Sequence, residues 1–400
     1  MTDAERLIAE FEAGRLIRPS VDDLNIVDLA NAMASLAGID SISLTPGADV
    51  IAQLIGPADH LVFVVADGLA MGLVEALGSD AFMRQHVATT LHTVFPSTTA
   101  SAFTSLATGQ WPNRHAALGW HTYVPEVDAV TTIIPFVRSV DNVPLTDLGL
   151  KVEQAFPVPS LAAHLARDSL SLVPQPLANS TFSKYISGGS ARAGYGVLLQ
   201  ALDTIAERIR VASQPTYTYL YVPDVDVAGH EFGYSDPRTL TTAVALDRCL
   251  QGLAETLSGH ARIVLTADHG GLDAAPGQIH RLEASDPLVK CLKHEPSGDN
   301  RAAYFDVPEG EEREFETLFR DRFGDRFFVI SVDDSEALEF FGPGPLSEAT
   351  RSRLGTFAAI SAGADVLLYA WPSRDPNRPI PIGHHSGLSP SEMRIPLIIA

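Results

Sequence analysis

Acidic and histidine side chains follow directly after several apolar runs of this 400-residue sequence, where they are placed to bind a cation. They are Asp67-Gly68, Asp226-Val-Ala-Gly-His230, Asp268-His269 and the pair His384-His385. Each feature alone has an ordinary explanation, because Asp caps turns and helices and adjacent histidines are common in surface loops. We expect these side chains to lie in loops, with Gly229 letting the backbone turn so that Asp226 and His230 face one ion. A mixed set of carboxylates and imidazoles favours Zn²⁺ first and Mn²⁺ second.

A second chemical feature is the hydroxyl-rich turn Pro96-Ser-Thr-Thr99, which leads into a helix-compatible stretch ending at Gly109. One interpretation makes a hydroxyl of this turn a simple helix N-cap. The other makes Ser97, Thr98 or Thr99 a nucleophile at a helix N-terminus, where free N–H groups and the helix dipole favour an anion. Residues 96–109 contain no acidic side chain, which favours an approaching phosphate.

Charge and composition narrow the function classes. Lys and Arg number 28 against 49 Asp and Glu, a net charge of −21, which repels nucleic acid and means that a phosphate site needs metal ions. Two cysteines exclude a disulfide framework and a Cys-type zinc site. No apolar run reaches membrane-spanning length and the N-terminus has no signal-peptide pattern. We therefore expect a cytoplasmic protein that has neither nucleic acid nor membrane as a partner.

The elements that must position these residues are strands alternating with helices. Apolar runs at 61–66, 216–222 and 262–267 predict buried strands, and periodic apolar residues predict helices at 22–37 and around 246–257. This order is typical of an α/β fold with a mostly parallel central sheet covered by helices on both faces. Such sheets gather their sites at the carboxyl ends of the strands.

The predicted elements become short and charged between residues 280 and 355, where they include an acidic helix at 311–323. The strand-like run 366–371 and the final run 395–400 indicate a return to the core. We predict a metal-binding catalytic core formed by 1–279 and 356–400, with 280–355 as an inserted α/β cap subdomain.

The ordered set Asp67, Thr99, Asp226…His230, Asp268-His269 and His385 resembles the alkaline phosphatase superfamily, and within it the type I phosphodiesterase/nucleotide pyrophosphatase family. The similarity covers about residues 60–122 and 216–272 and the closing motif GHHSGLSPSEMRIPL at 383–397. In that family the nucleophilic Thr stands nine residues before the Thr of a Thr-Gly pair, here Thr108-Gly109, which selects Thr99.

The resemblance also implies a ligand set and a mechanism. One Zn²⁺ would be held by Asp67, Thr99, Asp268 and His269, and the other by Asp226, His230 and His385. His385 is chosen over His384 because His-(Gly/Ser)-Gly-Leu is the family's closing context. The Thr99 oxygen would attack phosphorus, and water would hydrolyse the resulting phosphothreonine.

One departure concerns the choice of substrate. Nucleotide pyrophosphatases of this family usually carry an Asn five residues beyond the His of Pro-x-x-His-Gly, where this sequence has Trp120. We name Trp120 and the nearby Arg114 as candidate substrate-binding residues.

We therefore expect a two-metal hydrolase of small phosphate esters, chiefly phosphodiesters or nucleotide pyrophosphates. Alternatives within the superfamily are a phosphomonoesterase, a phosphonoacetate-type hydrolase and a phosphomutase. A sulfatase is excluded because neither cysteine lies in the required Cys-x-Pro-x-Arg setting. A metal-stabilised interaction protein without turnover is the alternative from another class. The oligomeric state stays open.

Overall fold

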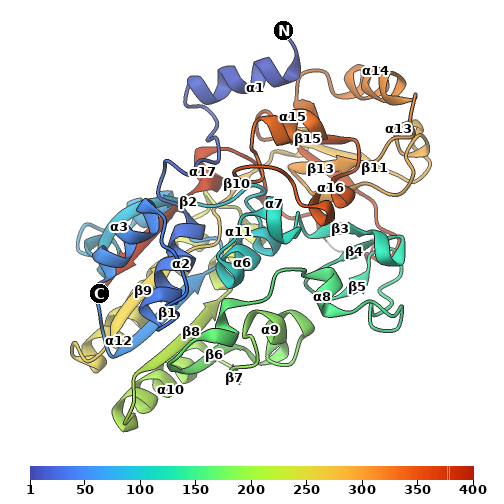
Figure 1. Cartoon of the computed structure of the whole chain (residues 1–400). Coiled ribbons are helices and arrows are strands. Elements are labelled where there is room, and N and C mark those ends of the chain that lie inside the picture. The colour runs from blue at the N-terminus through green and yellow to red at the C-terminus, as the bar shows by residue number, and fades with distance from the viewer. Residues whose placement is uncertain (376, 378) are drawn as a thin grey trace.

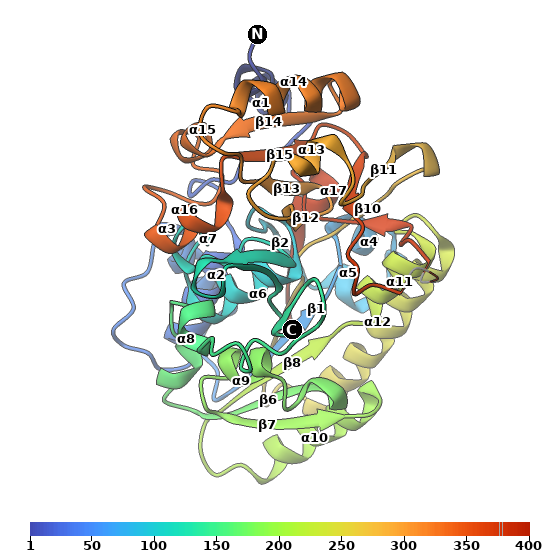
Figure 2. The same cartoon turned by 90° about the vertical axis from the view of Figure 1, so that its right-hand side faces the viewer.

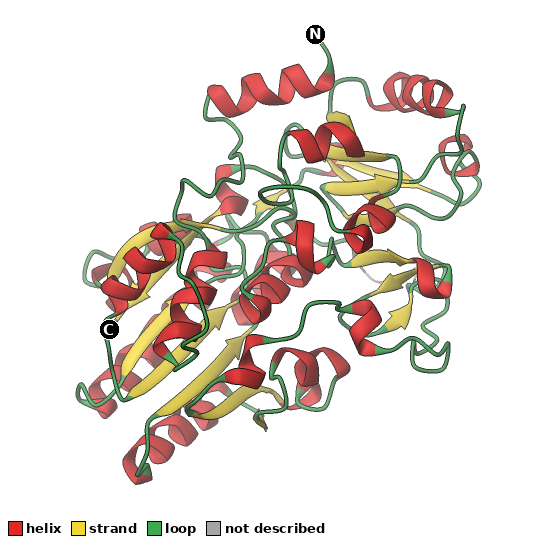
Figure 3. Ribbon diagram, in the orientation of Figure 1, coloured by secondary structure: helices red, strands yellow, loops and turns green. Residues whose placement is uncertain are grey.

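The computed structural model describes residues 1–375, 377 and 379–400, and its centre is a seven-stranded sheet (Figures 1 and 3). The strand order is β2-β18-β9-β1-β8-β6-β7, and the five strands from β9 to β7 are mutually parallel. Only β18 runs antiparallel to its neighbours, so the predicted α/β fold with a mostly parallel sheet is confirmed. The strands are β1 (His60–Ala66), β2 (Val87–His92), β6 (Asp168–Pro174), β7 (Ala191–Tyr195), β8 (Thr216–Val222), β9 (Arg262–Thr266) and β18 (Arg394–Ile399).

Helices cover both faces of this sheet, as Figure 2 shows with the sheet seen between them. One group packs together on one face: α2 (Ile26–Leu36), α3 (Pro46–Ile55) and α6 (Thr99–Thr108). The opposite face carries α4 (Met71–Ala76), α5 (Phe82–Gln85), α10 (Leu198–Val211), α11 (Asp224–Phe232) and α12 (Pro237–Leu257). Strand β1 is buried along almost its whole length because it lies mid-sheet between these layers, which explains its unbroken apolar sequence.

Three adjacent central strands end at the same edge of the sheet. Strand β1 pairs in parallel with β9 on one side and β8 on the other, and Ala66, the last residue of β1, lies beside Val222, the last of β8. The chain segments that follow these strands therefore start side by side.

A second seven-stranded sheet lies beside the core, on the right-hand side of the molecule in Figure 1, with the order β14-β15-β13-β12-β3-β4-β5 and antiparallel pairing throughout. We call it the cap sheet. Its strands are β3 (His121–Val124), β4 (Ala129–Thr132), β5 (Val137–Arg138), β12 (Ser297–Asp299), β13 (Ala302–Phe305), β14 (Phe327–Ser331) and β15 (Phe357–Ser361). Residues 121–138 thus join strands from the predicted insertion 280–355 in one sheet, and β15 lies just beyond that segment.

Buried phenylalanines pack the acidic helix α14 (Glu312–Phe323) against the cap sheet. The other helices around this sheet are α1 (Asp3–Glu12), α7 (Pro112–His115), α13 (Pro287–Lys290), α15 (Val332–Ala337) and α16 (Glu348–Leu354). Shorter helices elsewhere are α8 (Val152–Ala155), α9 (Thr181–Ile186) and α17 (Pro390–Met393), with 3₁₀ turns at Pro125–Val127, Leu161–His164, Gln175–Leu177 and Pro276–Gln278.

Two small two-stranded sheets complete the fold. Strand β10 (Leu272–Asp273) pairs with β17 (Gly383–His384), and β11 (Ile279–Leu282) pairs with β16 (Val366–Tyr369). Strand β16, in the run 366–371 that was expected to resume the core, pairs within the described chain with β11 and not with a strand of the central sheet. No helix in the described part of the chain is both long and apolar enough to cross a membrane.

Candidate active site

The ends of the three central strands bring the predicted acidic and histidine residues together. Asp67 directly follows β1, and Asp268 and His269 follow β9 after one residue. His269 Nε2 lies 3.2 Å from Asp268 Oδ2 and 3.6 Å from Asp67 Oδ1. The backbone N–H of Asp226, in the segment after β8, donates to the carbonyl oxygen of Asp67 at 3.0 Å. Sheet topology alone thus places side chains about 200 residues apart within direct contact.

Asp226 and His230 lie on helix α11, not in the loop expected from the sequence. Four residues make about one helical turn, so both side chains project from one face, and His230 Nε2 lies 3.3 Å from Asp226 Oδ2. Gly229 does not provide a turn. A Cβ at Gly229 would lie 2.8 Å from the Tyr234 ring, so this glycine permits close packing of that tyrosine.

The two adjacent histidines of the closing motif have different positions. His385 Nε2 lies 3.3 Å from His230 Nε2, and its ring stacks on His269 with 3.8 Å between ring centroids. His384 is fully buried on strand β17, and its Nδ1 lies 3.5 Å from Asn300 Nδ2. The structure thus brings His385, and not His384, into contact with the other candidate ligands.

The three clustered imidazoles share one orientation. Each has its Nδ1 within hydrogen-bond distance of a backbone carbonyl: His230 on Gly383 at 2.8 Å, His269 on Gly270 at 2.9 Å and His385 on Ser97 at 3.2 Å. A carbonyl oxygen only accepts, so Nδ1 carries the proton and Nε2 keeps its lone pair. This is the usual way in which proteins orient histidines for a metal.

The carboxylates are only partly satisfied by the protein. Tyr221 donates its hydroxyl to Asp67 Oδ2 at 2.7 Å, and Tyr234 donates to Asp226 Oδ1 at 2.8 Å. Asp268 Oδ1 accepts two backbone N–H groups. The remaining oxygens, Asp67 Oδ1 and Asp268 Oδ2, are buried without any hydrogen-bond partner. Buried acceptors without partners are costly, so these two oxygens fit the role of cation ligands.

Proton affinities in the cluster reflect uncompensated negative charge. Burial and the neighbouring carboxylates of Asp268 and Asp226 raise the pKa of Asp67 well above its usual value. Burial and the charge of Asp226 raise the pKa of Asp268 to about 7. The pKa of Asp226 is lowered instead. Burial raises it, but the neighbouring His230, His385 and His269 outweigh that effect. Burial lowers the pKa of His385 to about 3, so its ring is neutral and available as a ligand.

Donor atoms from these side chains form two overlapping groups in which all atoms lie within 4.8 Å of one another. One group is Asp226, His230 and His385, and the other is Asp67, Asp226 and His269. The donor types and the two unpartnered oxygens fit a pair of neighbouring divalent cations. Asp226 belongs to both groups, whereas the family resemblance gave it to one ion.

Thr99 is the first residue of helix α6 and faces this cluster. Its Oγ1 lies 3.2 Å from His269 Nε2. Thr98 is the N-cap residue and is almost fully buried, and its hydroxyl donates to Asp299 Oδ2 at 2.7 Å. Of the two threonines, Thr99 is therefore the one in contact with the candidate ligands.

A cavity of about 660 Å³ opens in front of Thr99 between the core and the cap sheet. Its lining includes the apolar side chains of Phe103, Phe182 and Ile186. Trp120, which is 37% exposed, lines this cavity. Arg114 is exposed on α7 and is not among the lining residues, so the structure does not bring it to the site.

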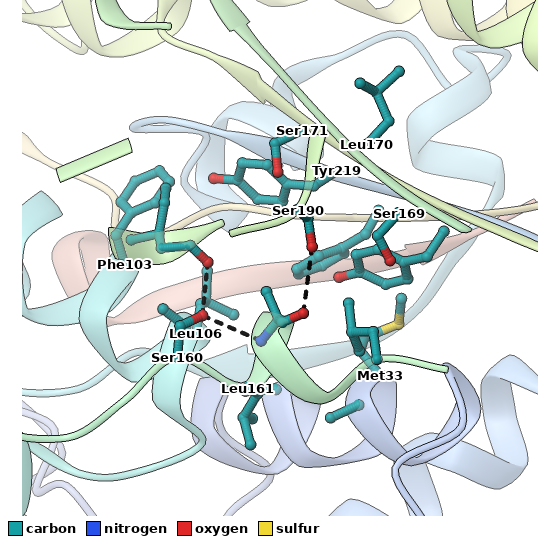
Figure 4. Close-up of a pocket in the computed structure, with 18 residues that line it drawn as sticks. Met33, Phe103, Leu106, Ser160, Leu161, Ser169, Leu170, Ser171, Ser190 and Tyr219 are labelled. Carbon is teal, nitrogen blue, oxygen red and sulfur yellow. Dashed lines mark hydrogen bonds between the residues drawn. The ribbon is translucent and has the colours of Figure 1, made fainter. Parts of the chain in front are cut away.

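A second pocket of about 70 Å³ lies between helix α6 and the sheet (Figure 4). It shares Phe103, Ile186 and Tyr219 with the large cavity and is otherwise lined by apolar and serine side chains. It contains none of the candidate metal ligands, so we place the chemistry in the large cavity.

Sequence reasoning did not identify several residues of the site. Tyr221 and Tyr234, which donate to the carboxylates, and Asp299, Asn300 and Arg374, which line the cavity, all belong here. The alternating run TYTYLYV offered a signal for Tyr221, because its last tyrosine lies at the carboxyl end of β8. Nothing in the sequence connected 299–300 with a site formed by the core strands.

Solved structures of other proteins share the fold of this chain. No curated protein matches the sequence significantly. Among solved structures, murine ectonucleotide pyrophosphatase/phosphodiesterase 5 is 15% identical, with a TM-score of 0.62 over 84% of this chain and 87% of that one. Phosphonoacetate hydrolase from Sinorhizobium meliloti 1021 is 16% identical, with a TM-score of 0.59 over 84% and 89% of the two chains. At these identities the likeness concerns the fold.

The family itself is shown by a sequence model. The model of type I phosphodiesterase / nucleotide pyrophosphatase matches residues 61–313, more than half of the chain, and confirms the resemblance and the phosphoester hydrolase class expected from the sequence. The chain therefore belongs to the type I phosphodiesterase / nucleotide pyrophosphatase family, within the alkaline phosphatase superfamily.

Proposed function

We propose that this phosphoester hydrolase cleaves phosphodiesters or nucleotide pyrophosphates with two zinc ions and a covalent phosphothreonine at Thr99. The observation that carries the proposal is the position of the Thr99 hydroxyl, 3.2 Å from His269 Nε2 and at the N-terminus of α6. A nucleophile there faces both the cation ligands and the free N–H groups of a helix that attract an anion.

The residues that would hold the ions are Asp226, His230 and His385 for one, and Asp67, Asp268 and His269 with Thr99 for the other. Three imidazoles with free Nε2 atoms favour zinc over magnesium or calcium, which prefer oxygen ligands alone. When bound, the ions supply positive charge that lowers the pKa of the Thr99 hydroxyl and stabilises negative oxygens on phosphorus.

The chain's own residues then act in two displacements. The Thr99 hydroxyl gives its proton to solvent and Oγ1 forms a bond with phosphorus, while the bond from phosphorus to the leaving oxygen breaks. The leaving group keeps the electron pair of that bond and takes a proton from solvent. Water next attacks the phosphothreonine, which restores the Thr99 hydroxyl and releases the phosphoryl product. The N–H groups of the first turn of α6 lie at the attacked group throughout.

Charge supports a diester over a monoester. Asp67, Asp226 and Asp299 line the cavity, and Arg374 is the only Lys or Arg among its described lining residues. Arg301, a further candidate for meeting a dianion, is fully buried and bonded to Glu392. A monoanionic diester needs less compensating charge, and its second substituent finds room in a cavity of this size.

The test compares Thr99→Ala with Thr98→Ala in the zinc-loaded protein. Thr99→Ala should keep its zinc and lose at least about 10⁴-fold in kcat for bis-p-nitrophenyl phosphate, because the nucleophile is gone. Thr98→Ala should lose less than about tenfold, the value of one hydrogen bond. Mass spectrometry of acid-quenched enzyme should find phosphate on Thr99. An active Thr99→Ala would refute the nucleophile, and a wild-type preference for p-nitrophenyl phosphate would refute the diester assignment.

A further inference from the structure

Negative oxygens on the attacked phosphorus need hydrogen-bond donors, and the side chains nearest Thr99 offer few. The carboxylates only accept, and the three imidazoles use their N–H groups on backbone carbonyls. The Thr98 hydroxyl is given to Asp299. Trp120 lines the cavity but has only a single indole N–H. Beyond the backbone N–H groups at the start of α6, a further side-chain donor must therefore come from another element.

The cap sheet meets the core at this point. Gly298 of β12 pairs with His121 of β3, and a Cβ at Gly119 would lie only 2.8 Å from the carbonyl carbon of Gly298. This close approach lets Asp299 Oδ2 accept hydrogen bonds from the Thr98 hydroxyl at 2.7 Å and from the backbone N–H of Trp120 at 3.2 Å. Asp299 thus fixes the end of β12 beside the residue that precedes Thr99.

Asn300 follows Asp299 and lines the same cavity as Thr99 and Asp226. Its backbone is held on both sides, because its N–H donates to Asp299 Oδ1 at 3.0 Å and its carbonyl accepts from Leu367 at 2.8 Å. Its Nδ2 lies 3.5 Å from Nδ1 of His384, whose chain neighbour is the candidate ligand His385. Asn300 therefore lies between the turn that carries Thr98 and Thr99 and the segment that carries His384 and His385.

We propose that Asn300, a residue of the cap, donates a hydrogen bond from Nδ2 to a non-bridging phosphoryl oxygen of the substrate, with Asp299 as its positioning residue. The proposal rests on the proposed function and adds a substrate-binding residue to it. The amide has two N–H donors, so contact with His384 leaves one for the substrate. A neutral donor also agrees with a monoanionic phosphodiester, which needs hydrogen bonds more than further positive charge.

The experiment measures orthovanadate binding by calorimetry and diester hydrolysis in the zinc-loaded protein. Asn300→Ala should bind vanadate at least about tenfold more weakly and lose roughly 10²–10³-fold in kcat/KM, the usual effect of losing one such donor. Asn300→Asp keeps the shape of the side chain, so it guards against misfolding, and it should bind vanadate still more weakly because a carboxylate repels the anion. Zinc content should stay that of the wild type in both variants.

The matched control is Asn179→Ala, which removes an exposed amide that is not among the residues lining the cavity. It should leave vanadate affinity and kcat/KM within about threefold of wild type. Unchanged vanadate binding in Asn300→Ala and Asn300→Asp would overturn the proposal, as would a loss that follows lost zinc. If the wild type hydrolyses no phosphodiester, the proposed function fails, while the vanadate measurement still decides the role of Asn300.

Discussion

The segment 384–392 contributes a residue to each of two buried groups of charged residues, and the two groups are built in opposite ways. The first group, the ligand cluster around Asp67, Asp226 and Asp268, has two oxygens without a partner. In the second group, Arg301 and Glu392 are both fully buried and form a two-point ion pair, with Nε–Oε1 2.7 Å and a second contact of 3.1 Å. Arg301 also donates to Ser361 and to two backbone carbonyls.

The difference shows where the protein itself supplies the counter-charge. Glu392 additionally accepts from the N–H of Gly387 and from Ser389, so its lone pairs are used. Burial by itself raises its pKa, yet Arg301 and these donors bring it below the usual range. In the ligand cluster the same chain leaves carboxylates uncompensated. We infer that the Arg301–Glu392 pair holds the segment 384–392 in place. The negative charge of the ligand cluster is instead balanced by bound cations.

Removing bound metal from the ligand cluster should change the unfolding free energy more than either substitution experiment below. Chelation returns the carboxylates of the ligand cluster to mutual repulsion, so the unfolding free energy should fall by about 5 kcal/mol if each of two sites was filled at about 100 times its Kd. Urea unfolding with and without chelator measures the change, and zinc should reverse it. Equal stability with and without chelator, in protein shown to contain zinc beforehand, would contradict the assignment of the cluster as a metal site.

Breaking the satisfied pair should have the next largest effect. Glu392→Ala leaves Arg301 buried without its partner and should cost about 3–5 kcal/mol, whereas Arg301→Met with Glu392→Leu should recover most of this loss. Because the pKa of Glu392 is lowered in the folded state, its contribution is present above its unfolded pKa near 4.3 and is lost as the pH falls through the folded value. Urea unfolding of chelated protein at pH 7 isolates the pair, and a cost below about 1 kcal/mol would contradict it.

The smallest expected effect is a gain in the unfolding free energy of the metal-free protein. Asp268→Asn removes one negative charge from the ligand cluster while an amide oxygen can still accept the two N–H groups bound by Oδ1. The metal-free variant should therefore be more stable than metal-free wild type, by about 1–2 kcal/mol, and should bind zinc poorly. Thermal unfolding after chelation checks the sign. A destabilised variant would mean that the cluster is satisfied within the protein.

Much of the fold, and the proximity of the candidate ligands, could be predicted from the sequence because the information is local. Asp67 and Asp268 stand directly beyond apolar runs, and a parallel sheet brings such positions to one edge whatever the loops between them do. Thr99 and His385 were chosen from registers within short motifs, and the structure places both in contact with other candidate ligands.

The other features of the site depend on contacts between segments far apart in the sequence, and such contacts produce no recognisable sequence pattern. Asp299 and Asn300 reach the site only because two glycine backbones, at 119 and 298, approach closely. Arg114 is near Thr99 in the sequence, yet its side chain is exposed to solvent on α7. Helix α11 was missed because a 9-residue helix carrying Asp, Gly and His has the composition of a loop.

The position of β18 between β2 and β9 has a consequence for synthesis on the ribosome. Strand β2 has no other partner in the described core sheet, and β18 begins roughly 300 residues later in the chain. At translation rates of about 5–20 residues per second, β2 waits roughly 15–60 s with an unpaired edge. Since His385 shortly precedes β18, the nascent chain completes its ligand set and its sheet within the same last second or two of this wait.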